Sequence, residues 1–100
     1  MVDKKEAREL LNGFLGEYNI VCRHLKMLEI DFKKEDREIQ ELWGSCLSCI
    51  TSEDYNECKT NLKKIRDVYV GLKTKYPKLK TDKYFPTPEK RLNGLIDYLS

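Results

Sequence analysis

The sequence predicts an all-α protein, a small up-and-down helical bundle of three long helices followed by a short C-terminal helix. Apolar residues recur at alternating spacings of three and four along most of the chain, and no segment shows the alternation expected of a strand. The chain has 100 residues, which is enough for one domain with its own core. We therefore expect a single helical domain over residues 1–100.

The first predicted helix spans about residues 3–30. Asp3 followed by Glu6 resembles a capping box at its start. Its apolar seam has the spacing of a helix packed against neighbours and consists of Ala7, Leu11, Phe14, Tyr18, Val21, Leu25 and Leu28. Phe32 and Ile39 continue this register without glycine or proline, so one helix of roughly fifty residues is an alternative that base rates disfavour.

Two further long helices are predicted over residues 34–50 and 52–76. Glu35 and Asp36 suit the positive end of the dipole of the second helix, whose stripe contains Ile39, Leu42, Trp43, Cys46, Leu47 and Ile50. Thr51 or Ser52 can cap the third helix, and Pro77 ends it. Its seam contains Tyr55, Cys58, Leu62, Ile65, Tyr69, Leu72 and Tyr76.

The C-terminal part of the chain predicts a long basic loop and a short helix. Residues 77–87 have no helical pattern, whereas Thr87 as N-cap and Pro88 in the first turn start a helix over 88–99. All five glycines fall inside predicted helices, where each costs about 1 kcal/mol relative to alanine. Close approach of a neighbouring helix or ligand would explain them, and so would sequence drift or a kink near Gly13 and Gly16.

The four cysteines have three interpretations. Core packing is favoured because Cys22, Cys46 and Cys58 lie at seam positions, where a thiol behaves as a small apolar group. A disulfide would join Cys46 or Cys49 to Cys58. Zinc is disfavoured because the chain has one C-x-x-C pair where a structural site normally uses two. We expect neither a metal nor another cofactor.

Sequence features of an enzyme are absent. His24 is the only histidine, and no nucleophile or orienting carboxylate accompanies it in the sequence. The sequence also lacks a phosphate-binding loop, a dinucleotide fingerprint and a metalloprotease helix motif. A thioredoxin-like role is disfavoured because the C-x-x-C pair ends its helix instead of beginning it. We therefore expect a protein that is not an enzyme and has no small-molecule substrate.

A basic region lies between residues 59 and 91, where eleven basic residues and three acidic residues give a local charge of +8. Its candidate binding residues are Lys59, Lys63, Lys64, Arg66, Lys73, Lys75, Lys78, Lys80, Lys83, Tyr84, Lys90 and Arg91. Lysines with interleaved aromatic residues could neutralise phosphates and stack on bases, could bind an acidic partner, or could serve solubility alone. Lysine outnumbers arginine, which favours nonspecific electrostatic binding over base reading.

The leading functional hypothesis is a non-catalytic interaction protein that binds and regulates or scaffolds a protein partner, or forms a homodimer. The short final helix cannot cover all of the longer ones, which leaves part of their surface, including Trp43, for a partner. A nucleic-acid-associated bundle using the basic region is the alternative. We expect an intracellular, cytoplasmic location because no signal peptide or membrane span is evident. One alanine and many lysines are typical of AT-rich genomes, such as those of viruses or mobile elements.

Overall fold

The computed structural model describes all residues from 1 to 100 and contains four α-helices and one short 3-10 helix. These elements are α1 (Lys4–Met27), α2 (Lys33–Thr51), α3 (Tyr55–Lys75), η1 (Pro77–Thr81) and α4 (Pro86–Leu99). The prediction of an all-α bundle with three long helices and one shorter helix is confirmed, and α1 and α2 are separate helices.

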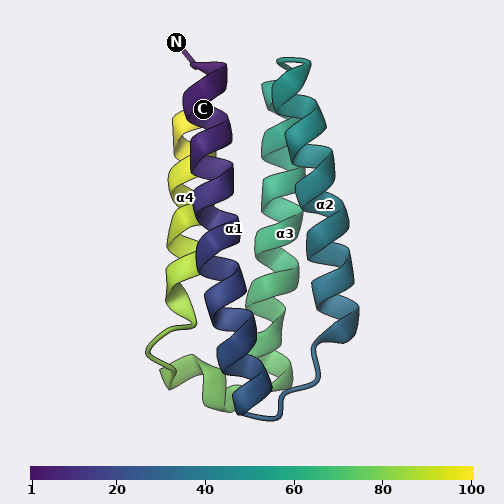
Figure 1. Cartoon of the computed structure of the whole chain (residues 1–100), viewed down its shortest axis with the longest axis vertical. Coiled ribbons are helices and arrows are strands. Elements are labelled where there is room, and N and C mark those ends of the chain that lie inside the picture. The colour runs from purple at the N-terminus through teal and green to yellow at the C-terminus, as the bar shows by residue number, and fades with distance from the viewer.

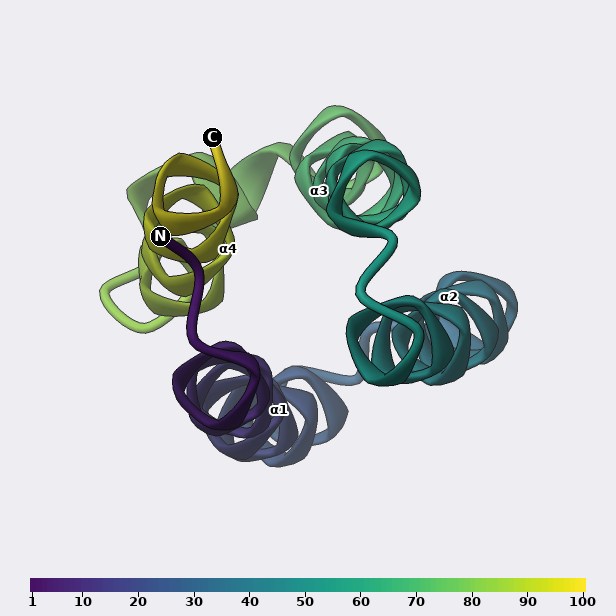
Figure 2. The same cartoon turned by 90° about the horizontal axis from the view of Figure 1, so that it is seen from above.

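The four helices run alternately up and down (Figure 1) and stand around a common core, so that each has two neighbours (Figure 2). Packing is closest between α2 and α3 and between α1 and α4, and it is sparser between α1 and α2. The two chain termini lie at one end of the bundle, and η1 closes the opposite end. None of the helices combines the length and apolar character needed to cross a membrane.

Most of the predicted seam residues form the core. On α1 the seam residues from Ala7 to Leu25 are buried, whereas on α2 only Ile39, Cys46 and Ile50 are buried and the other seam residues are partly buried. The aromatic rings of four residues contact one another in the core: Phe14, Tyr18, Tyr69 and Phe85. The rings of Tyr69 and Phe85 are stacked, with their centroids 4.4 Å apart. Each buried tyrosine has a polar partner: the Tyr18 hydroxyl donates to Asp36 Oδ1 and the Tyr69 hydroxyl to the Phe85 carbonyl, both at 2.6 Å.

Helix α1 ends three residues earlier than predicted because the chain turns in a Schellman motif. Glu29 adopts a positive φ of 60°, its N–H donates to the Lys26 carbonyl, and the Ile30 N–H donates to the Leu25 carbonyl. Ile30 and Leu25 are both buried, which supplies the apolar contact that accompanies this motif. The position in the left-handed region normally carries glycine, so glutamate there gives no sequence signal for the turn.

The junction between α2 and α3 repeats this geometry. Glu53 has a φ of 61°, and the N–H groups of Glu53 and Asp54 donate to the carbonyls of Ile50 and Cys49. The prediction that Thr51 or Ser52 caps the third helix is wrong: Asp54 is the N-cap, and its side chain accepts from the Glu57 N–H at 3.2 Å. Thr51 is instead the last residue of α2, and Ser52 is the C-cap of that helix.

The predicted basic loop is shorter than expected and partly helical. Residues 77–81 pack against the bundle because Leu79 of η1 is buried in the core. Helix α4 starts at Pro86, so Thr87 is not its N-cap as predicted. Two prolines fit in the first turn of α4 because the N–H groups there have no partner within the helix.

The glycines are not explained by close packing. A Cβ atom added to Gly16, Gly44, Gly71 or Gly94 would meet no atom within 4 Å, and at Gly13 it would lie in ordinary contact with Arg91 at 3.8 Å. Of the alternative explanations for these glycines, close approach of a neighbouring helix is therefore wrong.

Candidate functional site

Large apolar side chains are exposed in one place on the folded part of the chain. Ile20 is 52% exposed, Met27 82% and Tyr84 50%, and the remaining exposed large residue is the N-terminal Met1. Ile20, Met27 and Tyr84 surround a hollow of about 350 Å³, whose other lining residues are Arg23 and His24. We refer to these five residues as the α1 patch.

The α1 patch lies on the outer face of the C-terminal half of α1. Ile20, His24 and Met27 are spaced by four and three residues, which places them on one face of the helix over about 10 Å. The buried seam of α1 uses other positions, such as Val21 and Leu25, so these residues point away from the core. Helix α4 begins only at Pro86, and the chain segment before it, with Tyr84, borders this part of α1.

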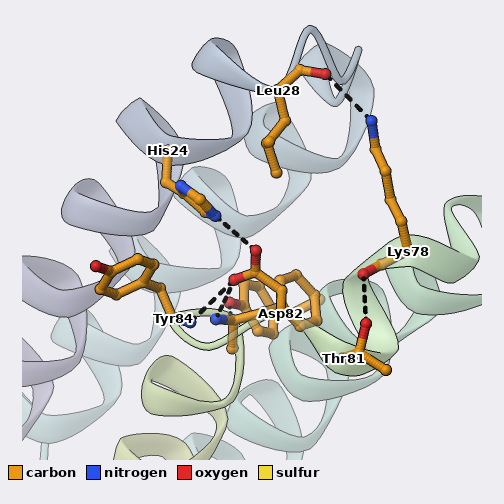
Figure 3. A network of polar contacts seen from close by, with 8 residues as sticks. His24, Leu28, Lys78, Thr81, Asp82 and Tyr84 are labelled. Carbon is orange, nitrogen blue, oxygen red and sulfur yellow. Dashed lines mark hydrogen bonds and ion pairs between the residues drawn. The ribbon is translucent and has the colours of Figure 1, made fainter.

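Asp82 connects the segment before α4 to α1 (Figure 3). Its Oδ2 lies 2.6 Å from His24 Nε2, and its Oδ1 accepts from the N–H groups of Tyr84 at 2.9 Å and Phe85 at 3.0 Å. Burial raises the pKa of the Asp82 carboxyl, but the hydrogen bonds from His24 and the two N–H groups outweigh it and hold this pKa below its ordinary value. One carboxylate thereby fixes Tyr84 beside the His24 ring, with ring centroids 5.0 Å apart.

Two further hydrogen bonds attach the η1 end of the bundle to the end of α1. Lys78 Nζ donates to the Leu28 carbonyl at 3.3 Å (Figure 3), and the Tyr76 hydroxyl donates to the Asp31 carbonyl at 2.8 Å. Lys78 places a positive charge at the negative end of the α1 dipole. The surface around the α1 patch is therefore held by contacts from α1, η1 and the segment before α4.

Two cationic side chains lie at the hollow. Arg23 lines it, and Lys83 Nζ lies 5.9 Å from the centre of the Tyr84 ring. The nearest carboxylate in the network, Asp82, already accepts hydrogen bonds from His24 and two backbone N–H groups. No acidic side chain lines the hollow.

Two other hollows differ from the α1 patch in character. One of about 620 Å³ lies between α2 and α3 and is lined mainly by polar residues, among them Glu38, Glu41 and Asp67. The other, of about 430 Å³, lies at the turn between α1 and α2, and its two apolar lining residues, Ile30 and Phe32, are both buried. Neither presents exposed large apolar side chains.

The predicted basic region does not form one continuous surface of free charges. Lys73 pairs with Glu89, Lys75 with Glu35 and Arg91 with Glu17, at distances of 3.3 to 3.6 Å. Arg66 donates to Asn93 at 3.0 Å, and Lys78 caps α1 as described above. The remaining lysines have no ion pair and are distributed over α3, η1, the segment before α4 and α4 itself: Lys59, Lys63, Lys64, Lys80, Lys83 and Lys90.

Trp43, the predicted partner-binding residue, is half-buried between α2 and α1. Its indole N–H donates to the Leu11 carbonyl at 3.4 Å, and its ring packs against the core. Trp43 therefore fills the sparser interface between these two helices. It is remote from the α1 patch, because its contact on α1, Leu11, lies more than two helical turns before Ile20.

All four cysteines are free thiols, and Cys46 and Cys58 face each other inside the core. The Sγ of each lies 3.9 Å from the backbone carbonyl oxygen of the other. Cys49 is half-buried and accepts from the Asn61 amide at 3.8 Å. Burial raises the pKa of the Cys22 thiol to about 11, and the contact with Cys58 together with burial raises that of Cys46 above its ordinary value. No three potential metal-ligating side chains converge.

Sequence reasoning found Tyr84 but missed Ile20, Met27 and the partner of His24. A usable signal existed, because Ile20 and Met27 are apolar, lie seven residues apart and fall outside the seam of their helix. The comparisons with known proteins found no matching family model, no similar curated protein and no similar solved structure. The α1 patch, defined by geometry and chemistry, is thus the basis for a functional proposal.

Proposed function

We propose that this chain is a non-catalytic interaction module that binds a protein partner through the α1 patch and thereby regulates or scaffolds it. The supporting observation is that Ile20, Met27 and Tyr84 are exposed around a single hollow. Exposure of apolar side chains to water is unfavourable, and burying them against a partner lowers the free energy by about 25 cal/mol per Å². A cluster of such residues with a polar border is typical of a binding surface.

The arrangement around His24 supports binding over catalysis. His24 with Asp82 resembles the part of a catalytic site in which a carboxylate orients a histidine base. Nucleophilic catalysis also needs a nucleophile beside the base. Asp82 is the hydrogen-bonded partner of the His24 ring, and the Tyr84 ring packs beside that ring with the two centroids 5.0 Å apart. In this proposal the pair positions the α1 patch.

Nucleic-acid binding through the basic region is the second candidate function. The lysines without ion pairs support it, whereas the pairing of Lys73, Lys75 and Arg91 with carboxylates weakens it. A cytoplasmic location is part of the proposal and is supported by the four free cysteines, a state that reducing compartments maintain. We further propose a viral or mobile-element origin, on composition alone.

Replacing apolar groups of the α1 patch tests the proposed function. Ile20→Gln/Met27→Gln introduces two good helix formers at exposed positions, and Glu9→Gln/Asn12→Gln is a matched control elsewhere on α1. We expect the control and the unchanged chain to purify from their source cells with the same protein partner, quantified by mass spectrometry, and the double variant to lose it. Equal recovery with all three chains would refute the proposal.

A further inference from the structure

We infer that the α1 patch takes an amphipathic helix of a partner protein whose apolar side chains are flanked by Asp or Glu. This inference rests on the proposed function and specifies the chemistry of the partner. Three features of the patch determine it: the apolar anchors, the cationic border and the shape of the surface.

The charges around the hollow select an acidic partner. Arg23 lines the hollow, and Lys83 reaches the Tyr84 ring, while no acidic residue lines it. Asp82 is largely shielded from a partner, because 13% of its side chain is exposed and both of its oxygens already accept hydrogen bonds or face His24. Carboxylates beside an apolar anchor would pair with Arg23 and Lys83, which raises the association rate and fixes the register of binding.

The shape of the patch selects a helix. Ile20, His24 and Met27 extend along α1 as a straight row, against which another helix can lay residues at positions i, i+4 and i+7. Tyr84 borders the same hollow from the segment before α4. The bundle has no strand edge to which an extended peptide could add, and one tyrosine does not make the aromatic groove that proline-rich peptides require.

The charges also argue against a second copy of this chain as the occupant. In a two-fold symmetric dimer each patch would face its own duplicate, so that Arg23 and Lys83 of one copy would approach those of the other. Like charges placed together at an interface oppose association.

The inference can be tested with synthetic peptides and the intact chain. The probe is a helical peptide with leucines at positions i, i+4 and i+7 and glutamates beside them, and matched peptides replace all glutamates by lysine or all leucines by alanine. Amide signals of the ¹⁵N-labelled chain are followed by NMR at low and high salt. We expect the glutamate peptide to shift signals of Ile20, Arg23, Met27 and Tyr84, with an affinity that falls severalfold as salt increases.

A charge-reversed chain makes the test specific. Arg23→Glu/Lys83→Glu changes two exposed residues, and we expect this variant to bind the lysine peptide better than the glutamate peptide. The inference is overturned when the unchanged chain binds the lysine peptide equally well, when no peptide shifts the patch signals, or when these signals shift with the concentration of the chain alone. If the peptides fail but Ile20→Gln/Met27→Gln still loses its protein partner in copurification, the proposed function stands and only the acidic helix is excluded as the occupant.

Discussion

The carboxylate of Asp82 lies 2.6 Å from the imidazole of His24, although 58 residues separate them in the sequence. This contact connects the segment before α4 to the C-terminal half of α1. The two side chains are largely shielded from solvent, with 24% of His24 and 13% of Asp82 exposed. Because Asp82 also accepts a hydrogen bond from the N–H of Tyr84, two residues further along the chain, the contact also determines where one side of the α1 patch lies.

Removing Asp82 should destabilise the protein more than removing His24. Asp82→Ala loses three hydrogen bonds, and we expect the free energy of unfolding to fall by about 2 kcal/mol, against about 1 kcal/mol for His24→Ala. Urea denaturation of both variants and the double variant measures the coupling between them. Asp67→Ala, at an exposed carboxylate without an ion pair, is the control. Additive effects of the two substitutions would show that the contact contributes nothing.

The low pKa of Asp82 also predicts a pH dependence. A carboxyl whose pKa is lower in the folded chain stabilises the fold above its unfolded value, which is about 3.9, and loses that contribution as pH falls through the folded value. The part of the stability difference between the unchanged chain and Asp82→Asn that the carboxylate supplies should therefore shrink as pH falls below about 4. A difference that grows on acidification would contradict the assignment.

Glu29 offers a stabilising substitution. Its φ of 60° is costly for a side chain with a Cβ atom but not for glycine, and Glu29 makes no ion pair that would be lost. We expect Glu29→Gly to raise the free energy of unfolding by about 1 kcal/mol and Glu29→Ala to leave it nearly unchanged. Thermal denaturation compares the two. Equal effects of glycine and alanine would mean that backbone conformation is not the cause.

The buried tyrosines predict a loss of stability at high pH. Burial raises the pKa of the Tyr69 phenol, so the folded chain holds this proton after the unfolded chain has released it, and stability falls as pH rises above about 10. Tyr69→Phe should weaken this dependence and should cost about 1 kcal/mol at neutral pH, because the Phe85 carbonyl loses its donor. Tyr84→Phe, at an exposed ring, should change neither quantity in urea denaturation across this pH range.

The arrangement of the cysteines predicts the behaviour of their thiols. Without reductant, four thiols should react with a chromogenic disulfide reagent after denaturation, whereas Cys46 and Cys58 should react slowly in the folded chain because they are buried. Two reactive thiols in the denatured chain would indicate a disulfide and would contradict this expectation. The Cys46→Ser and Cys58→Ser variants identify which thiols are protected.

The fold was predictable from the sequence to the extent that apolar spacing determines it. The seam from Ala7 to Leu25 follows from periodicity alone, because burial of a stripe is the main force that packs a helix. The end of α1 and the start of α3 were placed less well, since the turns before and after α2 use glutamate where glycine would have signalled a left-handed residue. The start of α4 was misplaced because two prolines and Thr87 offered competing boundaries.

The candidate site was less accessible to sequence reasoning than the fold. Trp43 stood out as a large apolar residue, but its exposure depends on the distance between α1 and α2, which periodicity does not report. The spacing of Ile20 and Met27 outside the seam indicates a second apolar face on α1, but the exposure of that face depends on where α4 begins, which this spacing does not report. The contact of His24 with Asp82 spans 58 residues and has no local signal.

Site-specific crosslinking at position 84 tests the central claim most directly. A photoreactive benzoylphenylalanine replaces Tyr84 in one chain and Gln40, an exposed residue of α2, in a control chain, and both are irradiated in the cells that make the protein. We predict a covalent adduct with one other polypeptide from position 84, mapped to an acidic helix, and none from position 40. No adduct from position 84, or the same adducts from both positions, would contradict the assignment of the α1 patch as the binding surface.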